Sequence, residues 1–360
     1  LGYPGETALF SAPGPTGNTA NVRGWLGSST DKAPDWYVFG NLSFLAYNGC
    51  VSAGGTNSAA HGWRIVGNEC EGLTRTSQLQ TGTIVPGGNY SKVLGNTIHG
   101  GRTGDKLDHA IYSMSCSEDV EIAWNYIYDN NFAAGPLVSV NYESTRCAEG
   151  QYAGVASIHD NIVDATNYPS RCVYAYDQSY LFGDPVTPVT KVYNNVFINC
   201  GGPGADGALV MRNGAMEAYN NTFYGTRTYC LEISGPTVRI AYLNFKNNIC
   251  HMAGTATSYT RYESDAPVHD AEKNIYYGLG NYSGSMDASP INADPRFVNA
   301  AGGNFRLSSD SPAIQAGATT IGTYIVRDKD GNMRSKATAD IGAYLFNSSV
   351  PNPPQNLRFK

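Results

Sequence analysis

One asparagine recurs at a nearly constant interval through most of the chain, and this repeat limits the fold more than any other feature. Successive spacings are 27, 28, 29, 36, 34, 26, 27 and 26 residues, as in a solenoid where each interval builds one coil. Asn tolerates the left-handed α conformation of a sharp bend, and stacked Asn amides can hydrogen-bond to one another as a ladder. We therefore place each asparagine at a bend between two strands. The repeat consists of Asn41, Asn68, Asn96, Asn125, Asn161, Asn195, Asn221, Asn248 and Asn274.

A second apolar segment lies between successive asparagines and predicts another strand in each coil. In RCVYAYD, alternation along a strand places Val173 and Ala175 in the core and Tyr174 and Tyr176 on the outer face. The same alternation directs Arg212 outward. The sequence therefore predicts an all-β fold: a single-stranded right-handed parallel β-helix of about nine or ten coils with an asparagine ladder.

The sequence changes character towards its C-terminal end. We expect coils over residues 1–285, closing coils and a cap over 286–348, and a proline-rich linker to a further module over 349–360. A cap is expected because an open end coil exposes strand edges and apolar core. Asp328, Asp330 and Asn332 resemble part of a calcium loop, but no glutamate follows at the EF-hand position, so a structural turn is favoured.

The charge pattern argues against two classes of partner. The net charge is −6 and the pI is about 5.5, and no cluster of Lys and Arg could neutralise a run of phosphates, so a nucleic acid is not expected. No apolar stretch is long enough to predict a membrane span.

Because the chain begins abruptly at Leu1, we expect an N-terminal segment to have been removed. We expect a monomer.

The chain contains eight cysteines. They lack the paired spacing of a zinc site, and their even number fits disulfides formed in an oxidising compartment. The alternative is that several are buried thiols stacked along the core. Cys116 and Cys147 are the expected pair, because each follows a predicted strand in consecutive coils.

The asparagine repeat and the two C-terminal motifs, at 293–317 and 327–346, resemble the pectate-lyase-like superfamily of secreted right-handed parallel β-helix proteins. That superfamily includes polysaccharide lyases, glycoside hydrolases, uronate epimerases and phage depolymerases. The resemblance covers nearly the whole chain. It implies a secreted or cell-surface protein that acts on a polysaccharide, and the chemistry must be argued from the site.

The two longest intervals of the repeat, which end at Asn161 and Asn195, point to the middle coils. Long loops on a solenoid usually border its binding face, so we place the site on coils 3 to 6. Polar side chains are dense there. The candidate catalytic residues are Lys106, His109, Arg171 and Tyr174, and the candidate substrate-binding residues are Tyr112, Asn141, Tyr176 and Arg212.

These residues suit β-elimination of a uronic-acid glycan. Such a lyase needs a base for the proton next to the carboxyl group, a proton donor for the leaving oxygen, and positive charge near the carboxylate. Asp108 could orient the His109 imidazole for proton transfer. The resemblance implies a His with a Tyr on adjacent coils as base and acid, which here means His109 with Tyr112, Tyr174 or Tyr176. Lys106, Arg171 and Arg212 could supply the positive charge.

Carboxylates leave two further possibilities open. Related lyases use calcium, and its candidate ligands here are Asp105, Asp108, Glu143 and Asp177. A glycoside hydrolase needs two facing carboxylates, and Glu143 with Asp108 or Asp177 is an admissible pair. The polygalacturonase signatures Asn-Thr-Asp, Asp-Asp and Arg-Ile-Lys are absent, which lowers that expectation. A non-catalytic adhesin or carbohydrate-binding β-helix is the alternative of a different class.

Overall fold

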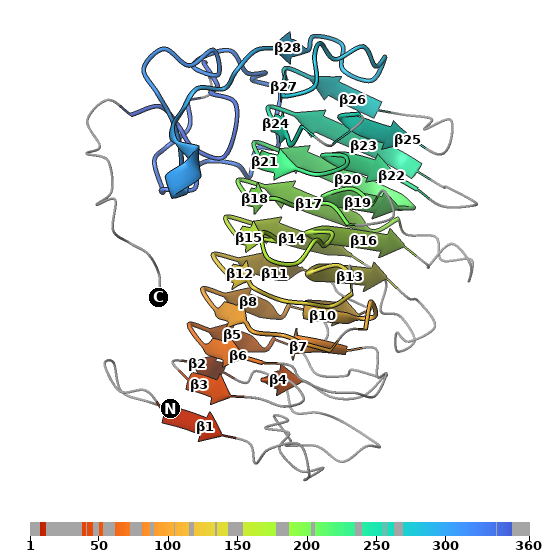
Figure 1. The fold of residues 1–360 in the computed structure, drawn as a ribbon, viewed down its shortest axis with the longest axis vertical. Helices are drawn as coiled ribbons and strands as arrows, with labels where there is room; N and C mark the ends of the chain where they lie inside the picture. Colours follow the sequence, from red (N-terminus) through yellow and green to blue (C-terminus); the bar gives the residue numbers. More distant parts are fainter. Residues whose placement is uncertain are drawn as a thin grey trace.

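The computed structural model has 30 β-strands in its described residues, and three parallel sheets form the walls of a solenoid. Each coil contributes one strand to sheet B, then one to sheet A, then one to sheet C (Figure 1). The structure describes residues 8–11, 38–40, 42–45, 50–52, 62–72, 81–86, 90–103, 105–114, 119–133, 135–142, 154–177, 187–202, 206–234, 240–254, 256, 258–262, 269–335 and 337–347.

The sheets are defined by their strands. Sheet A contains β1 (Ala8–Ser11), β3 (Leu42–Leu45), β6 (Glu69–Glu71), β9 (Thr97–His99), β12 (Tyr126–Tyr128), β15 (Ile162–Asp164), β18 (Val196–Ile198), β21 (Thr222–Thr226), β24 (Ile249–Met252), β27 (Ile275–Tyr277) and β28 (Ile291–Asn292). Sheet B contains β2 (Val38–Gly40), β5 (Arg64–Val66), β8 (Lys92–Leu94), β11 (Val120–Ala123), β14 (Val155–His159), β17 (Val189–Tyr193), β20 (Gly214–Tyr219), β23 (Ile240–Lys246) and β26 (His269–Glu272). Sheet C contains β4 (Val51–Ser52), β7 (Thr81–Val85), β10 (Asp108–Met114), β13 (Val138–Tyr142), β16 (Val173–Asp177), β19 (Leu209–Arg212), β22 (Leu231–Ile233) and β25 (Thr260–Tyr262).

This arrangement confirms the predicted right-handed parallel β-helix. One row of inward side chains runs up sheet C, because the parallel register aligns Val138, Val173, Leu209 and Leu231 on successive coils. All four are fully buried. Ala175 and Met211 also face the core, so the alternation predicted from the sequence places the outward residues of β16 and β19 correctly.

The asparagine ladder is also confirmed. The Nδ2 group of Asn161 donates to Asn195 Oδ1 on the next coil at 3.0 Å, and Asp287 accepts from Asn274 at 2.7 Å and so ends the ladder. The same link joins Asn68 to Asn96, Asn96 to Asn125, Asn125 to Asn161, Asn195 to Asn221, Asn221 to Asn248 and Asn248 to Asn274. Asn41 lies outside the described residues.

The ladder asparagines do not themselves adopt the left-handed conformation that we expected of them. The left-handed conformation belongs to the residue before each ladder asparagine, for example Asp160 with φ of 55°. Ladder asparagines are instead selected by their buried amides, which satisfy backbone groups and each other. The bend residues on successive coils are Gly67, Gly95, Trp124, Asp160, Asn194, Asn220, Asn247 and Lys273, all with positive φ.

The C-terminal segment folds back along the side of the solenoid and does not lie across its open end. It begins with the antiparallel pair β29 (Phe297–Asn299) and β30 (Asn304–Leu307), joined by the short 3-10 helix η3 (Ala300–Gly302). Figure 1 shows this segment in blue beside the sheet A strands of the upper coils. Met286, Asp287 and β28 belong to the expected closing region and lie at the end of the last coil. The closing coils and cap over 286–348, with their boundary at residue 285, stay a prediction.

The bend asparagines of the upper coils bind this segment. Asn194 Nδ2 donates to the Arg327 carbonyl at 2.7 Å, and Asn220 Nδ2 to the Asp340 carbonyl at 2.9 Å. Asn247 forms a reciprocal pair with the backbone of Ala318, donating at 2.8 Å and accepting at 2.7 Å. Asn therefore serves two purposes at these bends, since it adopts positive φ and also bonds the packed segment.

The end of the last coil is closed by residues that precede this segment. The Tyr282 ring stacks on Tyr276 with ring centroids 4.2 Å apart, and Met286 joins the core. The turn at Asp328 is structural, as expected, because its carboxylate accepts from Asn332 and Leu345. The proposed linker at 349–360 lies outside the described residues. No helix among the described residues is long and apolar enough to cross a bilayer.

Candidate functional site

The outward side of sheet C gathers most of the predicted site residues. Two outward rows follow from the register. One aligns Tyr112, Ser139, Tyr174, Val210, Glu232 and Arg261, and the other aligns Asn141, Tyr176 and Arg212. We call these two rows, with His109, Arg171 and Asp206 beside them, the sheet C face. It spans six successive coils, which at about 4.8 Å per coil is long enough for several sugar rings.

Two arginines surround Tyr174 at the centre of this face. The Arg171 guanidinium lies 5.5 Å from the centre of the Tyr174 ring, a cation–π distance. From the next coil, Arg212 Nη1 donates to Tyr174 Oη at 3.3 Å, and its guanidinium lies 5.4 Å from the Tyr176 ring. The arrangement places one guanidinium against the Tyr174 ring and another at its hydroxyl.

Tyr112 and Asn141 extend the face by two coils towards the N-terminal end. Asn141 Nδ2 donates to Tyr112 Oη at 3.1 Å, and Tyr112 lies beside His109 with ring centroids 4.9 Å apart. The structure therefore brings the four predicted substrate-binding residues, Tyr112, Asn141, Tyr176 and Arg212, onto one surface.

His109 is buried at the edge of this face with one ring nitrogen committed. Its Nδ1 donates to the Pro136 carbonyl at 2.8 Å, since a carbonyl can only accept, and this fixes the tautomer whose Nε2 carries a lone pair. Burial lowers the pKa of His109 to about 4, and the Arg171 charge adds to this, against the opposing effects of the Pro136 bond and Asp105. His109 is therefore a neutral imidazole near pH 7, anchored by the backbone of the next coil.

Arg171 is held by a residue that the sequence reasoning missed. Its Nη2 forms an ion pair with Asp206 Oδ2 at 2.6 Å, while its Nε is buried and has no hydrogen-bond partner among the described residues. A buried guanidinium N–H without an acceptor is costly unless a ligand or water fills the place. Arg171 thus carries a buried N–H without an acceptor among the described residues, close to His109 and Tyr174.

Glu232 was also missed, and it fixes the turn that carries Asp206. Glu232 Oε2 accepts the Gly207 N–H at 2.5 Å, and Oε1 lies 3.8 Å from Arg261 Nη1. Gly207 has no room for a side chain, because an added Cβ would lie 2.8 Å from Glu232 Cβ. Burial raises the pKa of Glu232, and the Asp206 charge contributes. The outward position of Glu232 in YCLEIS is a signal from which it could have been found.

The remaining predicted residues do not join the face. Lys106 is exposed in the turn before β10, and no contact brings it to His109 or Tyr174 in the described part of the chain. Asp108 and Asp177 are buried, with exposures of 0% and 5%. Asp105 lies near enough to His109 to affect its pKa. Glu143, like the predicted disulfide of Cys116 with Cys147, lies outside the described residues.

Among the described residues these positions do not gather into a metal site, and calcium stays a prediction because Glu143 lies outside those residues. The described residues hold no group of three or more His, Cys, Asp or Glu side chains able to bind a metal ion. Two of the four expected ligands are buried in the wall, so the described carboxylates do not fit a calcium ion exposed to substrate.

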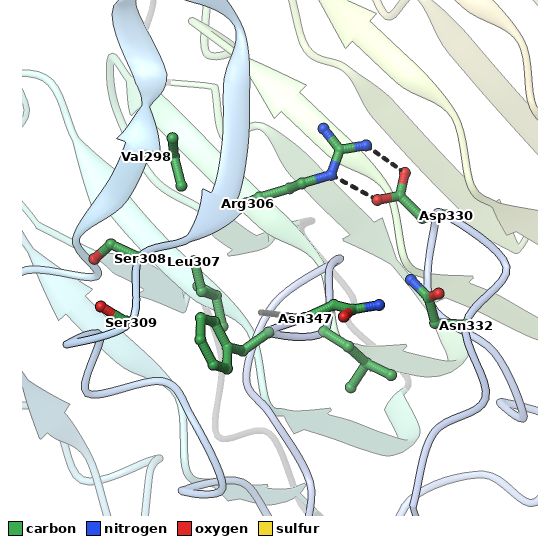
Figure 2. A pocket seen from close by; sticks show the side chains of 10 residues that line it. Val298, Arg306, Leu307, Ser308, Ser309, Asp330, Asn332 and Asn347 are labelled. Carbon is green, nitrogen blue, oxygen red and sulfur yellow. Dashed lines mark hydrogen bonds and ion pairs between the residues drawn. The ribbon is translucent and has the colours of Figure 1, made fainter. Parts of the chain in front are cut away.

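A cavity of about 360 Å³ lies elsewhere, in the C-terminal segment. Figure 2 shows Arg306 and Asp330 joined by two hydrogen bonds on one side of it, with Ser308 and Ser309 on the other. Its charged groups satisfy each other, and it lies apart from the sheet C face. The candidate site is therefore the sheet C face and not this cavity.

Comparison with known proteins gives limited results. Residues 216–322 match a family model described as a domain of unknown function, DUF5123. The chain is similar to the crystal structure of pectate lyase Pel9A, with 14% sequence identity and a TM-score of 0.49, over 95% of this chain and 87% of that chain. No curated protein matches. The fold assignment therefore depends on the sheets and the ladder described above.

Proposed function

We propose that the sheet C face binds an anionic, uronic-acid-containing polysaccharide and cleaves it by β-elimination. The observation that carries this proposal is the buried Arg171 Nε, which has no acceptor among the described residues. This donor lies beside a neutral histidine and a tyrosine flanked by two arginines. A sugar carboxylate supplies the missing acceptor and the opposite charge.

In the proposed reaction His109 is the base. Its Nε2 accepts the proton next to the carboxyl group, and the Nδ1–H bond to Pro136 keeps the ring oriented. Negative charge then develops on the carboxylate, where Arg171 stabilises it. Tyr174 donates its proton to the leaving glycosidic oxygen. Because Arg212 already donates to Tyr174 Oη, the hydroxyl hydrogen is free for this transfer and the resulting phenolate is stabilised.

Secretion fits the same proposal. The disulfide between Cys172 and Cys200 is compatible with an oxidising compartment, and polymeric uronates are found outside cells. We therefore propose an extracellular location, with the polysaccharide as partner.

The test is incubation with a panel of alginates, pectins, ulvans and glycosaminoglycans, with and without EDTA. Ultraviolet absorbance reports the unsaturated uronate that β-elimination creates, and a parallel assay reports new reducing ends. Rising absorbance that His109→Ala abolishes supports the proposal. Absence of any absorbance across the panel, with folded protein, contradicts it.

A hydrolase is the second candidate, and one observation favours it. Asp206 and Glu232 are close enough for the charge of Asp206 to raise the pKa of the buried Glu232. In a hydrolase the carboxyl with the raised pKa is the general acid and the other carboxylate is the base or nucleophile. The combinations with Glu143 stay predictions, because Glu143 lies outside the described residues. New reducing ends without absorbance, lost in Glu232→Gln, identify this chemistry. Binding without either product indicates a carbohydrate-binding β-helix.

A further inference from the structure

Four thiols form two repeated contacts between neighbouring coils. Cys50 and Cys230 each directly precede a sheet C strand, and the register from β4 to β22 places them in the same row as Cys172. Cys172 is the residue of that row which already carries a disulfide, to Cys200 of the next coil. A cysteine that directly precedes a sheet C strand can therefore reach the following coil.

The neighbours of Cys50 and Cys230, which are Cys70 and Cys250, also share one row. Cys70 lies at the centre of β6 and Cys250 in β24, and the sheet A register places both in the central inward row. Cys70 lies close enough to Cys50 to raise the pKa of the Cys50 thiol, and Cys230 does the same to the Cys250 thiol. Each pair joins one coil to the next with the same separation in sequence.

We propose that Cys50 with Cys70, and Cys230 with Cys250, are two disulfide sites that close when the chain folds under oxidising conditions. Each closure converts two thiols into one S–S bond, releasing two protons and two electrons. A low-molecular-weight disulfide such as oxidised glutathione accepts them and becomes two thiols. One thiolate attacks the oxidant to form a mixed disulfide, and the second thiolate displaces the small thiol.

Burial determines when this reaction can occur. All four sulfur-bearing residues are 0% exposed, and burial raises the pKa of Cys50 and of Cys250 well above the usual value. The reactive thiolate is therefore scarce and inaccessible in the folded protein. The bonds form before the coils close, and a chain folded in reducing conditions keeps these thiols protected.

The two sites differ in one neighbour. Cys230 Sγ lies 3.4 Å from Met252 Sδ. Met252 is the second residue after Cys250, and the second residue after Cys70 is Gly72, which has no side chain. Cys230 must leave the methionine sulfur to bond Cys250, whereas no such contact exists at Gly72. We therefore expect the Cys50–Cys70 site to close more completely, and Met252→Leu to raise the oxidised fraction of the other.

The test is peptide mapping of the full chain folded with oxidised or with reduced glutathione. The protein is unfolded in iodoacetamide, digested and analysed by mass spectrometry. With oxidised glutathione we expect cross-linked peptides for both pairs in addition to Cys172–Cys200. With reduced glutathione the four thiols should be alkylated only after unfolding. Predominantly alkylated Cys50 and Cys70 after oxidative folding overturns the proposal.

Single variants establish the pairing. Cys50→Ala should leave Cys70 alkylated and the Cys230–Cys250 peptide unchanged, and Cys230→Ala should give the converse. If Cys70 then cross-links elsewhere, the assigned partner is wrong. Should a variant fail to fold, the wild-type map alone decides, and oxidised wild type should melt several degrees above reduced wild type.

Discussion

Arg212 donates a hydrogen bond at 3.3 Å to the hydroxyl of Tyr174 on the preceding coil. The donor and acceptor come from β19 and β16, which pair in parallel register, so the contact depends on the stacking of two coils and not on a loop. A tyrosine that accepts from a guanidinium keeps its own proton available for donation. Tyr112 also accepts a hydrogen bond, but from the neutral amide of Asn141, whereas a guanidinium can stabilise the phenolate of Tyr174. We therefore assign Tyr174 as the proton donor in the proposed elimination.

Tyr174→Phe should therefore abolish most of the activity while leaving the fold intact. The variant loses one hydroxyl on a half-buried ring, and general acid catalysis contributes about 100-fold or more to rate. We expect kcat to fall by at least that factor with little change in KM. Tyr176→Phe is the comparison, because it removes a hydroxyl from a substrate-binding residue of the same strand and should raise KM while leaving kcat nearly unchanged. Equal losses in both variants would contradict the assignment.

The neutral His109 predicts how activity and stability depend on pH. With a pKa of about 4, the base is unprotonated through the neutral range, so kcat/KM should decline only as pH falls towards 4. The folded pKa lies below the unfolded value, so the unfolded chain binds more protons between pH 6.5 and 4. The contribution of His109 to the free energy of unfolding is therefore fully present above pH 6.5. It falls by about 3 kcal/mol in total as the pH decreases from 6.5 to 4.

Urea denaturation at a series of pH values measures the second effect. His109→Gln should lessen the dependence of unfolding free energy on pH between 6.5 and 4, after comparison with wild type in the same buffers. His99→Gln is the matched control, because its ring lies outside the sheet C face. If wild type and His109→Gln show the same slope, His109 is not buried as a neutral group.

The sequence was sufficient to predict the fold, because the same pattern of residues recurs in each coil of the solenoid. The ladder asparagines recur in step, and alternation alone placed Tyr174, Tyr176 and Arg212 outward. The site was harder, because a register between coils decides which residues meet. Asp206 and Glu232 contact Arg171 and Gly207 across coils. Alternation turns Glu232 outward, but it does not show which residue of a neighbouring coil the side chain meets. Alternation also could not show that Asp108 is fully buried.

Glu232 should be important for stability and for the position of Arg171. Glu232→Ala leaves the Gly207 N–H without its acceptor, and an unsatisfied buried donor costs about 2 kcal/mol. Glu232→Gln keeps an acceptor for that N–H and should lose less. Urea denaturation of the two variants measures the difference. If the alanine variant is no less stable than the glutamine variant, the bond to Gly207 does not hold the turn.

The bend asparagines predict how firmly the C-terminal segment is attached. Asn247 has φ of 59° and makes both a donor and an acceptor bond to the backbone of Ala318. Asn247→Gly accommodates the same backbone conformation but removes both bonds, so about 2 kcal/mol of stability should be lost without strain at the bend. Limited proteolysis should then cut near Ala318 faster than in wild type. Gly95→Asn is the control, because its bend has positive φ and nothing lies within 4 Å of an added Cβ. Unchanged cleavage near Ala318 in Asn247→Gly would show that apolar packing, and not the amide pair, holds this segment against the coils.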